Sequence, residues 1–236
     1  LAASLVPAVS EAHATGNKGR IIERASTAMK IANLFAIPAC IGLCVLATPI
    51  SQLIYATPNA GPVIAVISLS IIFLGWQQIT AGILQGLGRT IIPMLSIFIG
   101  LMVKAILDYQ LTGSIELGIN GAAWATNLNF AIAALINLVF VKRYVGSVIQ
   151  CMNLLKIIIS AMAMGGATQV SFMFLVDMVG NGAAVAISIL IAFIVYILSL
   201  WITKAIVMDD MYHMPVIGKR LRKRQVEENR IYEEQY

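Results

Sequence analysis

A lysine and an aspartate stand four residues apart inside an apolar stretch of the chain. Lys104 and Asp108 belong to a segment, residues 90–111, that has about the 20 residues a membrane helix needs. An ionisable side chain costs roughly 2.5 to 3.5 kcal/mol in the middle of such a helix, so both residues are candidates for function. With Ser96 and Gly100 they recur at four-residue steps, which predicts one polar stripe along a helix.

Two roles are open for this stripe. Lys104 can face a water-filled cavity, where its ammonium group contacts an anionic substrate or lies beside a coupling ion. Alternatively, Lys104 and Asp108 form an ion pair on their own helix, with the lysine side chain extending toward the membrane surface. The direction in which the stripe faces decides between these roles.

No pattern of catalysis or metal binding accompanies this pair in the sequence. His13 and His213 lie in polar flanks, without the spacing of a metal site or a catalytic triad. The three cysteines, Cys40, Cys44 and Cys151, show no disulfide or zinc spacing. Phosphate-binding loops, HExxH and dinucleotide fingerprints are also absent from the sequence. We therefore expect no enzyme, no cofactor and no metal site.

The composition places the chain in a membrane. Of its 236 residues, 59% are hydrophobic and only 11% are charged, whereas soluble domains carry about 25% charged residues. The net charge of +5 does not indicate nucleic acid, because the basic residues form short clusters between apolar runs. Anionic lipid surfaces are better partners for such clusters. We expect an integral membrane protein that binds no nucleic acid.

Six apolar segments, each near the length of a membrane helix, predict an all-α fold that is integral to the membrane. They span about residues 31–55, 62–84, 90–111, 118–141, 154–176 and 182–207. Three further regions flank them. Residues 1–10 are predicted as the end of a truncated transmembrane helix, residues 11–30 as a polar cytoplasmic loop, and residues 208–236 as a basic and then acidic cytoplasmic tail. The basic cluster of the tail is expected to bind anionic lipids.

The distribution of lysine and arginine predicts the orientation of these segments. If residues 11–30 are cytoplasmic, six alternating spans place Arg89, Lys142, Arg143 and the tail on the same side. Of the 16 Lys and Arg residues, all except Lys104 then fall in or beside cytoplasmic segments. The positive-inside rule favours this arrangement. We expect a multi-pass protein with its C-terminus in the cytoplasm.

Polar residues inside other segments predict packing faces, lining residues and a hinge. Residues 121–137 carry a stripe of small and polar side chains every four positions, with Asn129 at its centre. Such stripes bring membrane helices together, and this one can equally line a path for a solute. Gln77 and Gln78 need hydrogen-bond partners on other helices or in a wet cavity. Pro38 removes one backbone hydrogen bond and predicts a kink or a moving hinge.

Four blocks of sequence, in matching order and spacing, carry a resemblance to a transporter family. They are SLVPAVSEA (residues 4–12), IPACIGLCVLATPISQLIYA (37–56), ILQGLGRTIIP (83–93) and GINGAAWAT (118–126). Together they resemble the polysaccharide biosynthesis and stage V sporulation protein B-like branch of the multidrug/oligosaccharidyl-lipid/polysaccharide exporter superfamily. The relatives of this branch include flippases for lipid-linked cell-wall precursors, among them the lipid II flippases.

The resemblance implies a fourteen-helix transporter of two lobes that works by alternating access in the bacterial cell membrane. The six segments then form the C-terminal lobe, and its partner is a missing N-terminal lobe of the same protein. The implied substrate is a saccharide or peptidoglycan precursor linked to undecaprenyl pyrophosphate. In this hypothesis Lys104, Gln77, Gln78 and Asn129 are the candidate substrate contacts, and Asp108 is a candidate ion-pair or coupling residue.

Two other functions stay open. A cation-coupled multidrug exporter of the same superfamily needs an acidic coupling site, for which Asp108 is the candidate within the predicted segments. A non-transporting membrane scaffold for cell-wall or spore-envelope assembly would act through the basic tail. Assays of drug resistance and ion dependence separate the exporter from a flippase, and deletion of residues 208–236 tests the scaffold.

Overall fold

The computed structural model describes residues 2–113 and 117–204, and the regular structure of these residues is helical. The predicted tail, residues 208–236, lies outside the described residues. The helices are α1 (Ala2–Ala14), α2 (Lys18–Val45), α3 (Ala47–Tyr55), α4 (Gly61–Ser68), α5 (Ser70–Gly86), α6 (Ile91–Thr112), α7 (Ile119–Tyr144) and α8 (Cys151–Ile202). The expected all-α class is thereby confirmed.

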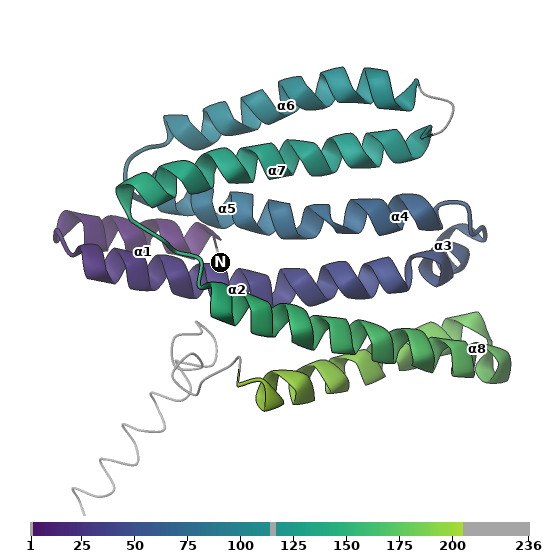
Figure 1. Ribbon diagram of the computed structural model, residues 1–236. Coiled ribbons are helices and arrows are strands. Elements are labelled where there is room, and N and C mark those ends of the chain that lie inside the picture. Colours follow the sequence, from purple (N-terminus) through teal and green to yellow (C-terminus); the bar gives the residue numbers. More distant parts are fainter. Residues whose placement is uncertain (1, 114–116, 205–236) are drawn as a thin grey trace, which may run out of the picture.

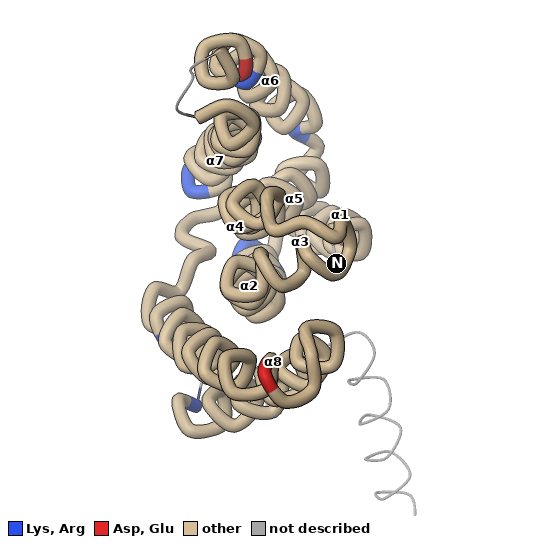
Figure 2. The backbone as a smooth tube through the Cα atoms, turned by 90° about the vertical axis from the view of Figure 1, so that its right-hand side faces the viewer, with Lys and Arg blue, Asp and Glu red and all other residues tan. Residues whose placement is uncertain are grey.

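The helices stand side by side in a curved row (Figures 1 and 2). At one end of the row α6 packs against α7, which in turn packs against α5 and α4. Next comes α2, which contacts α5 on one side and α8 on the other, and α8 forms the other end of the row. The remaining helices flank this row, with α1 against α2 and α5 and the short α3 against α4. The described helices therefore form an open row and not a closed ring.

Five helical stretches are long and apolar enough to cross a membrane: α2, α4 together with α5, α6, α7 and α8. With 52 residues, a straight α8 would be about 78 Å long, more than twice the roughly 30 Å core of a bilayer. Instead α8 reverses at Gly180, where φ is 78° and ψ is 166°, and its two arms run back alongside each other (Figure 1). The arms contain the expected segment 154–176 and, up to Ile202, the expected segment 182–207.

The polar stretch at residues 11–30, expected to be a loop, is mostly helical, and this expectation is wrong. Only a short turn separates α1 from α2. The turn ends at Asn17, whose side-chain oxygen accepts a hydrogen bond from the Arg20 amide at 3.1 Å and so caps α2. Apolar residues recur on one face of this first part of α2 and are buried there, which stabilises a helix despite the high charge density. The buried residues of this face are Ile21, Ala25, Ala28 and Met29.

The first predicted span, residues 31–55, is broken instead of continuous. α2 ends at Val45, and the chain turns into α3 (Figure 1). Pro49 explains the position of this break, because it lacks the N–H that would bond to the Val45 carbonyl and its ring collides with that carbonyl. Pro38, by contrast, lies inside α2 without ending it. A second junction, at Leu69, divides the next predicted span into α4 and α5.

Two buried apolar clusters hold the row together. One lies between α1, α2, α5 and α7 and includes Ile83 and Val141. The other joins α2 to both arms of α8 and includes Ile37, Met164 and Leu200. Around these clusters, many large apolar side chains of α6 and α8 are exposed, as expected for helix surfaces that face lipid.

Replacement of Gly180 by alanine is expected to destabilise the reversal of α8. The backbone conformation at this residue is essentially restricted to glycine, and a Cβ there is strained by about 1–3 kcal/mol. The free energy of unfolding should fall by this amount, as measured by thermal unfolding of the purified protein in detergent. Gly166→Ala is the matched control, because a Cβ at this helical residue meets no atom within 4 Å. Equal losses in the two variants would contradict the role given to Gly180.

Candidate functional site

The polar stripe predicted on α6 begins in the interface with α7. Ser96 and Gly100 are buried there, and Lys104 and Asp108 continue the stripe along the last part of α6. A Cβ on Gly100 would lie 2.8 Å from the carbonyl oxygen of Asn129 on α7. Glycine therefore permits a close approach of the two backbones at this level.

The small and polar stripe predicted on α7 meets this face of α6. Ser96 Oγ lies 2.8 Å from Asn137 Oδ1 across the interface and equally far from Pro93 O on its own helix. Its single proton serves one of these acceptors at a time. Asn137 Nδ2 and Asn129 Oδ1 are buried and have no hydrogen-bond partner among the described residues. With 7% of its surface exposed, Asn129 lies in helix packing, and its contact with substrate stays a prediction.

Lys104 and Asp108 form an ion pair on α6, as one of the two interpretations of the sequence describes. Lys104 Nζ lies 2.6 Å from Asp108 Oδ2, and the two side chains are 28% and 33% exposed. The ammonium group has three N–H donors, of which one is directed at Asp108. Asp108 Oδ1 is buried without a hydrogen-bond partner in the described part of the chain. Asp108 therefore offsets the positive charge that Lys104 presents to an anion, and binding of an anion by Lys104 stays a prediction.

The polar cluster predicted on α5 is divided between two sides of the helix. Gln77 is buried, whereas its neighbour Gln78 is exposed. Their neighbour Trp76 makes an interhelical hydrogen bond, in which its Nε1 donates to Asn33 Oδ1 on α2 at 2.6 Å. The structure does not bring Gln77 to Lys104, because α7 lies between α5 and α6 (Figure 2). The predicted substrate contacts therefore do not form one site within the described row.

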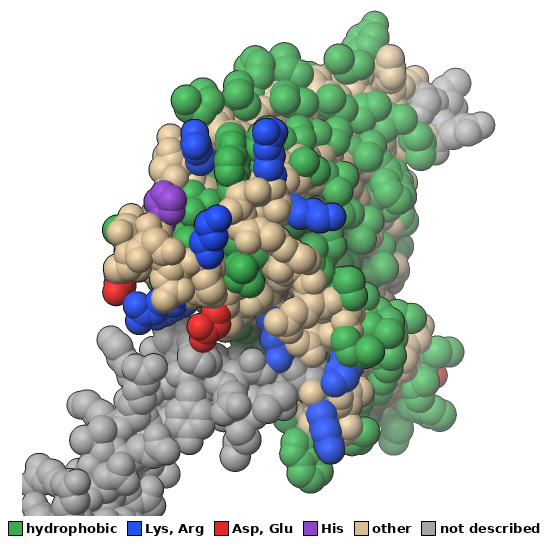
Figure 3. All heavy atoms as spheres, turned by 60° about the vertical axis from the view of Figure 1, so that its left-hand side comes forward, with side chains coloured by type: hydrophobic (Ala, Val, Ile, Leu, Met, Phe, Trp, Pro, Cys, Tyr) green, Lys and Arg blue, Asp and Glu red, His purple; other side chains and the backbone are tan. Residues whose placement is uncertain are grey.

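Basic side chains gather along one edge of the row, where α2 begins, α5 turns into α6 and α7 ends, and we call this edge the basic end (Figure 3). Arg89, in the turn between α5 and α6, lies over the ring of Tyr144 at the end of α7, with Cζ 5.3 Å from the ring centroid. Lys142 and Arg143 belong to the last turn of α7 and are exposed. The contact between Arg89 and Tyr144 links the α5–α6 turn to the end of α7, and the sequence predicts that both lie on the same side of the membrane. The basic end comprises Lys18, Arg20, Arg24, Arg89, Lys142 and Arg143.

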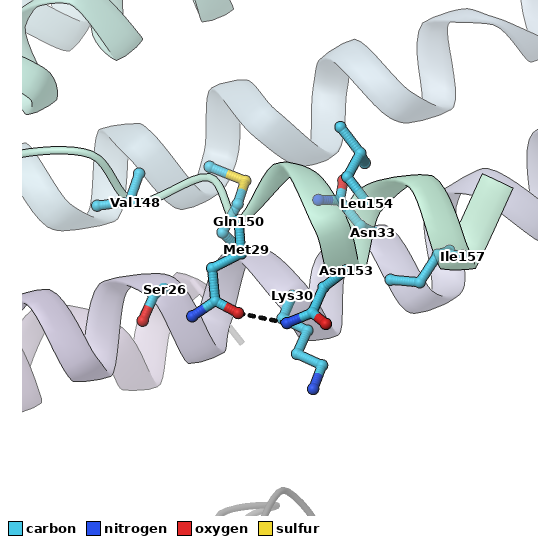
Figure 4. A pocket seen from close by; sticks show the side chains of 9 residues that line it. All are labelled: Ser26, Met29, Lys30, Asn33, Val148, Gln150, Asn153, Leu154 and Ile157. Atoms are coloured by element: carbon cyan, nitrogen blue, oxygen red, sulfur yellow. Dashed lines mark hydrogen bonds between the residues drawn. The ribbon is translucent and has the colours of Figure 1, made fainter. Parts of the chain in front are cut away.

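A small pocket lined by both polar and apolar side chains lies between α2 and the beginning of α8 (Figure 4). Ser26, Lys30 and Asn33 line it from α2, and Asn153 donates to Gln150 on the opposite side. Its volume of about 10 Å³ suits roughly one water molecule and is far too small for a saccharide or a phosphate head group. In the described part of the chain, no three His, Cys, Asp or Glu side chains come together as they would at a metal site.

Three interhelical hydrogen bonds were not expected from the sequence. They run from Tyr196 Oη to Leu34 O at 2.8 Å, from Asn127 Nδ2 to Val66 O at 2.8 Å and from Asn181 Nδ2 to Pro49 O at 3.1 Å. A proline four residues after Leu34 signals that the carbonyl of this residue loses its helical donor. The donors themselves carry no local signal, because each lies at least 61 positions away from its acceptor.

Neutralisation of Lys104 alone is expected to destabilise the protein more than neutralisation of the whole ion pair. In Lys104→Met, Asp108 loses its partner within the span, which should lower the free energy of unfolding by about 1–3 kcal/mol. In Lys104→Met/Asp108→Asn, no lone charge is left and most of this loss should be recovered. Thermal unfolding of the four proteins in detergent completes the double-mutant cycle. Lys142→Met, at an exposed position, is the control, and additive effects at positions 104 and 108 would contradict the coupling.

Comparison with known proteins adds family evidence to this geometry. The family described as lipid II flippase MurJ matches residues 1–176. The uncharacterized membrane protein YabM of Bacillus subtilis (strain 168) is 30% identical over 138 residues, which cover 58% of this chain and 26% of YabM. The lipid II flippase MurJ of the same organism is 24% identical over 175 residues, which cover 71% of this chain and 32% of that protein. The chain thus corresponds to only a minor part of the length of these relatives, and no solved structure matches it. Because the family match extends over most of the sequence, the chain belongs to the lipid II flippase MurJ family.

Proposed function

We propose that this chain is the C-terminal lobe of a flippase that moves a lipid-linked saccharide or peptidoglycan precursor, carried on undecaprenyl pyrophosphate, across the cytoplasmic membrane. The observation that carries the proposal is the family match over residues 1–176. The open row of helices supports it, because a row with α6 and α8 at its two ends encloses a cavity only together with further helices. An N-terminal lobe of the same protein would supply them, and rocking of the two lobes would expose the cavity to either side in turn.

Lys104 is the residue of this lobe that we assign to the anionic head group. Two of its N–H donors are not directed at Asp108 and can contact a diphosphate oxygen. A charge-assisted hydrogen bond of this kind is strong where water is scarce. Asp108 keeps the empty site neutral, and the diphosphate replaces it as the partner of Lys104 when the substrate binds. Asn129, which is buried against α6, joins the cavity lining in this proposal only when α6 and α7 separate.

The basic end supports an orientation in which it faces the cytoplasm. The substrate then enters the cavity from this end, and Lys104 lies about 20 Å further along α6 from Thr90, toward the outer leaflet. The C-terminus would lie in the cytoplasm, next to the anionic lipids that we propose for the tail. In this orientation the head group is drawn away from the membrane surface by a cation deeper in the membrane.

Replacement of Lys104 by alanine in the intact protein tests the proposal. Loss of a charged hydrogen bond to the head group is worth about 1.5–3 kcal/mol, so translocation should slow by about 10-fold or more. The assay is the appearance of labelled lipid II in the outer leaflet of cells whose own flippase has been depleted. Lys142→Ala, which removes a lysine at the basic end, is the control for a change in net charge. Unchanged translocation by Lys104→Ala would contradict the assigned role.

The same cells distinguish the other two functions. A cation-coupled multidrug exporter would confer ion-dependent drug resistance that Asp108→Asn abolishes, without rescue of the depleted cells. A scaffold would lose its function when residues 208–236 are deleted, whereas a flippase without this tail should still translocate its substrate. Rescue by the intact protein, sensitive to Lys104→Ala, is expected from the proposed flippase alone.

A further inference from the structure

A hydrogen bond between distant parts of the chain replaces the one that Pro38 removes from α2. In a regular helix the N–H of residue 38 would donate to the carbonyl of Leu34, but proline has no N–H. The hydroxyl group of Tyr196, on the second arm of α8, donates to this carbonyl at 2.8 Å. Tyr196 is 8% exposed, so water has little access to the bond. The backbone acceptor and its substitute donor are 162 positions apart in the sequence.

This bond joins α2 to the second arm of α8. α8 touches the rest of the described row chiefly through α2, with a minor contact to α3. Tyr196 belongs to a buried cluster whose other residues are apolar and come from α2 and from both arms of α8. They are Leu34, Ile37, Ile157, Ala161, Met164, Ala192 and Leu200. Apolar packing tolerates small rotations and shifts, whereas a hydrogen bond is directional and fixes the position of one helix on the other.

The two prolines in this part of the chain, Pro38 and Pro49, affect α2 differently. α2 ends at Val45, four residues before Pro49, but it continues past Leu34, four residues before Pro38. At Leu34 the carbonyl that proline leaves without a helical donor has the hydroxyl of Tyr196 instead. Since a lipid environment supplies no donor of its own, the substitute must come from the protein.

We propose that Tyr196 is a positioning residue, whose hydrogen bond to the Leu34 carbonyl fixes the position of the two arms of α8 on α2 beside Pro38. When this hydrogen bond breaks, α8 is free to move on α2 during transport. A single interhelical hydrogen bond contributes only a modest net free energy in a membrane, so this bond can break and re-form. It acts on one arm of a hairpin that is otherwise held mainly by apolar contacts with α2. The transport part of this inference rests on the proposed function, whereas the positioning part does not.

A double-mutant cycle between Tyr196 and Pro38 tests the inference in the intact protein. Tyr196→Phe keeps the ring and removes the donor, and its unfolding temperature should fall by about 2 °C. Pro38→Ala restores an N–H that can bond to Leu34 O within α2, so the hydroxyl group is no longer needed. In the Pro38→Ala background, Tyr196→Phe should therefore have no effect. Tyr109→Phe, at a tyrosine that is 87% exposed, and Pro93→Ala, in the first turn of α6, are the matched controls.

A distance measurement reports the position of α8 directly. Spin labels on Cys44 of α2 and on Met178→Cys of α8 occupy exposed positions, with Cys151→Ser removing the other exposed native cysteine of the described part. The unaltered pair should give one narrow distance distribution, and Tyr196→Phe should add a second population. Pro38→Ala should remove this second population. A purely structural loss of packing would not be rescued by a change on the other helix.

The outcomes separate this inference from the proposed function. Equal effects of Tyr196→Phe in both proline backgrounds, or no effect in either, would overturn the positioning role. A second distance population together with an unchanged rate of lipid II translocation would overturn the role in transport. A changed rate in Tyr196→Phe that returns toward the original value with Pro38→Ala supports both. The stability and distance measurements need no substrate, so they judge the positioning role even if the intact protein fails to rescue flippase-depleted cells.

Discussion

The arrangement of the helices depends on one constraint of the bilayer. A backbone carbonyl that loses its helical donor must find another in the protein, because lipid offers none. Prolines and junctions make the helices irregular at three places, at Pro38, after Val45 and at Leu69, within two of the segments predicted to lie in the membrane. Close to each of them, a side chain of α7 or α8 donates to a backbone carbonyl, and at Leu34 this carbonyl is the one that has lost its helical donor. These pairs are Tyr196 and Leu34, Asn127 and Val66, and Asn181 and Pro49. Near these irregularities, hydrogen bonds therefore join α7 to α4, and α8 to α2 and α3.

The α6–α7 pair follows from close approach and partial pairing of polar groups. Gly100 lets the backbones meet, and Ser96 reaches Asn137 across the interface. Some polar atoms nevertheless lack partners in the described structure, including one on Asn129. An interface with unpaired polar groups is held less firmly than a fully satisfied one. This property fits the proposed transport cycle, in which α6 and α7 part and expose their polar faces to a hydrated cavity.

Local patterns in the sequence predicted several features that the structure contains. The apolar segment at 90–111 corresponds closely to α6, and the four-residue spacing of Lys104 and Asp108 yields their ion pair. The prediction failed at residues 11–30, because the charged first part of α2 resembles a loop in composition. Pro49 is the local cause of the break after Val45. The kink, however, was predicted at Pro38, which lies within α2. A proline tells where a hydrogen bond is lost, and not whether another part of the chain replaces it.

The sequence by itself determined the membrane class, the approximate spans, the clustering of basic residues and the polar stripes, because these depend on composition and on the helical repeat. The tertiary structure decided which stripes face each other and which residues stay apart. Gln77 and Lys104 lie on opposite sides of α7, although both are polar residues within predicted spans. Pro38 marks Leu34 as an acceptor without a helical donor, but no local pattern identifies Tyr196 as the residue that donates to it. The physical reason is that a donor far away in the chain satisfies a lost backbone hydrogen bond only after the helices have packed.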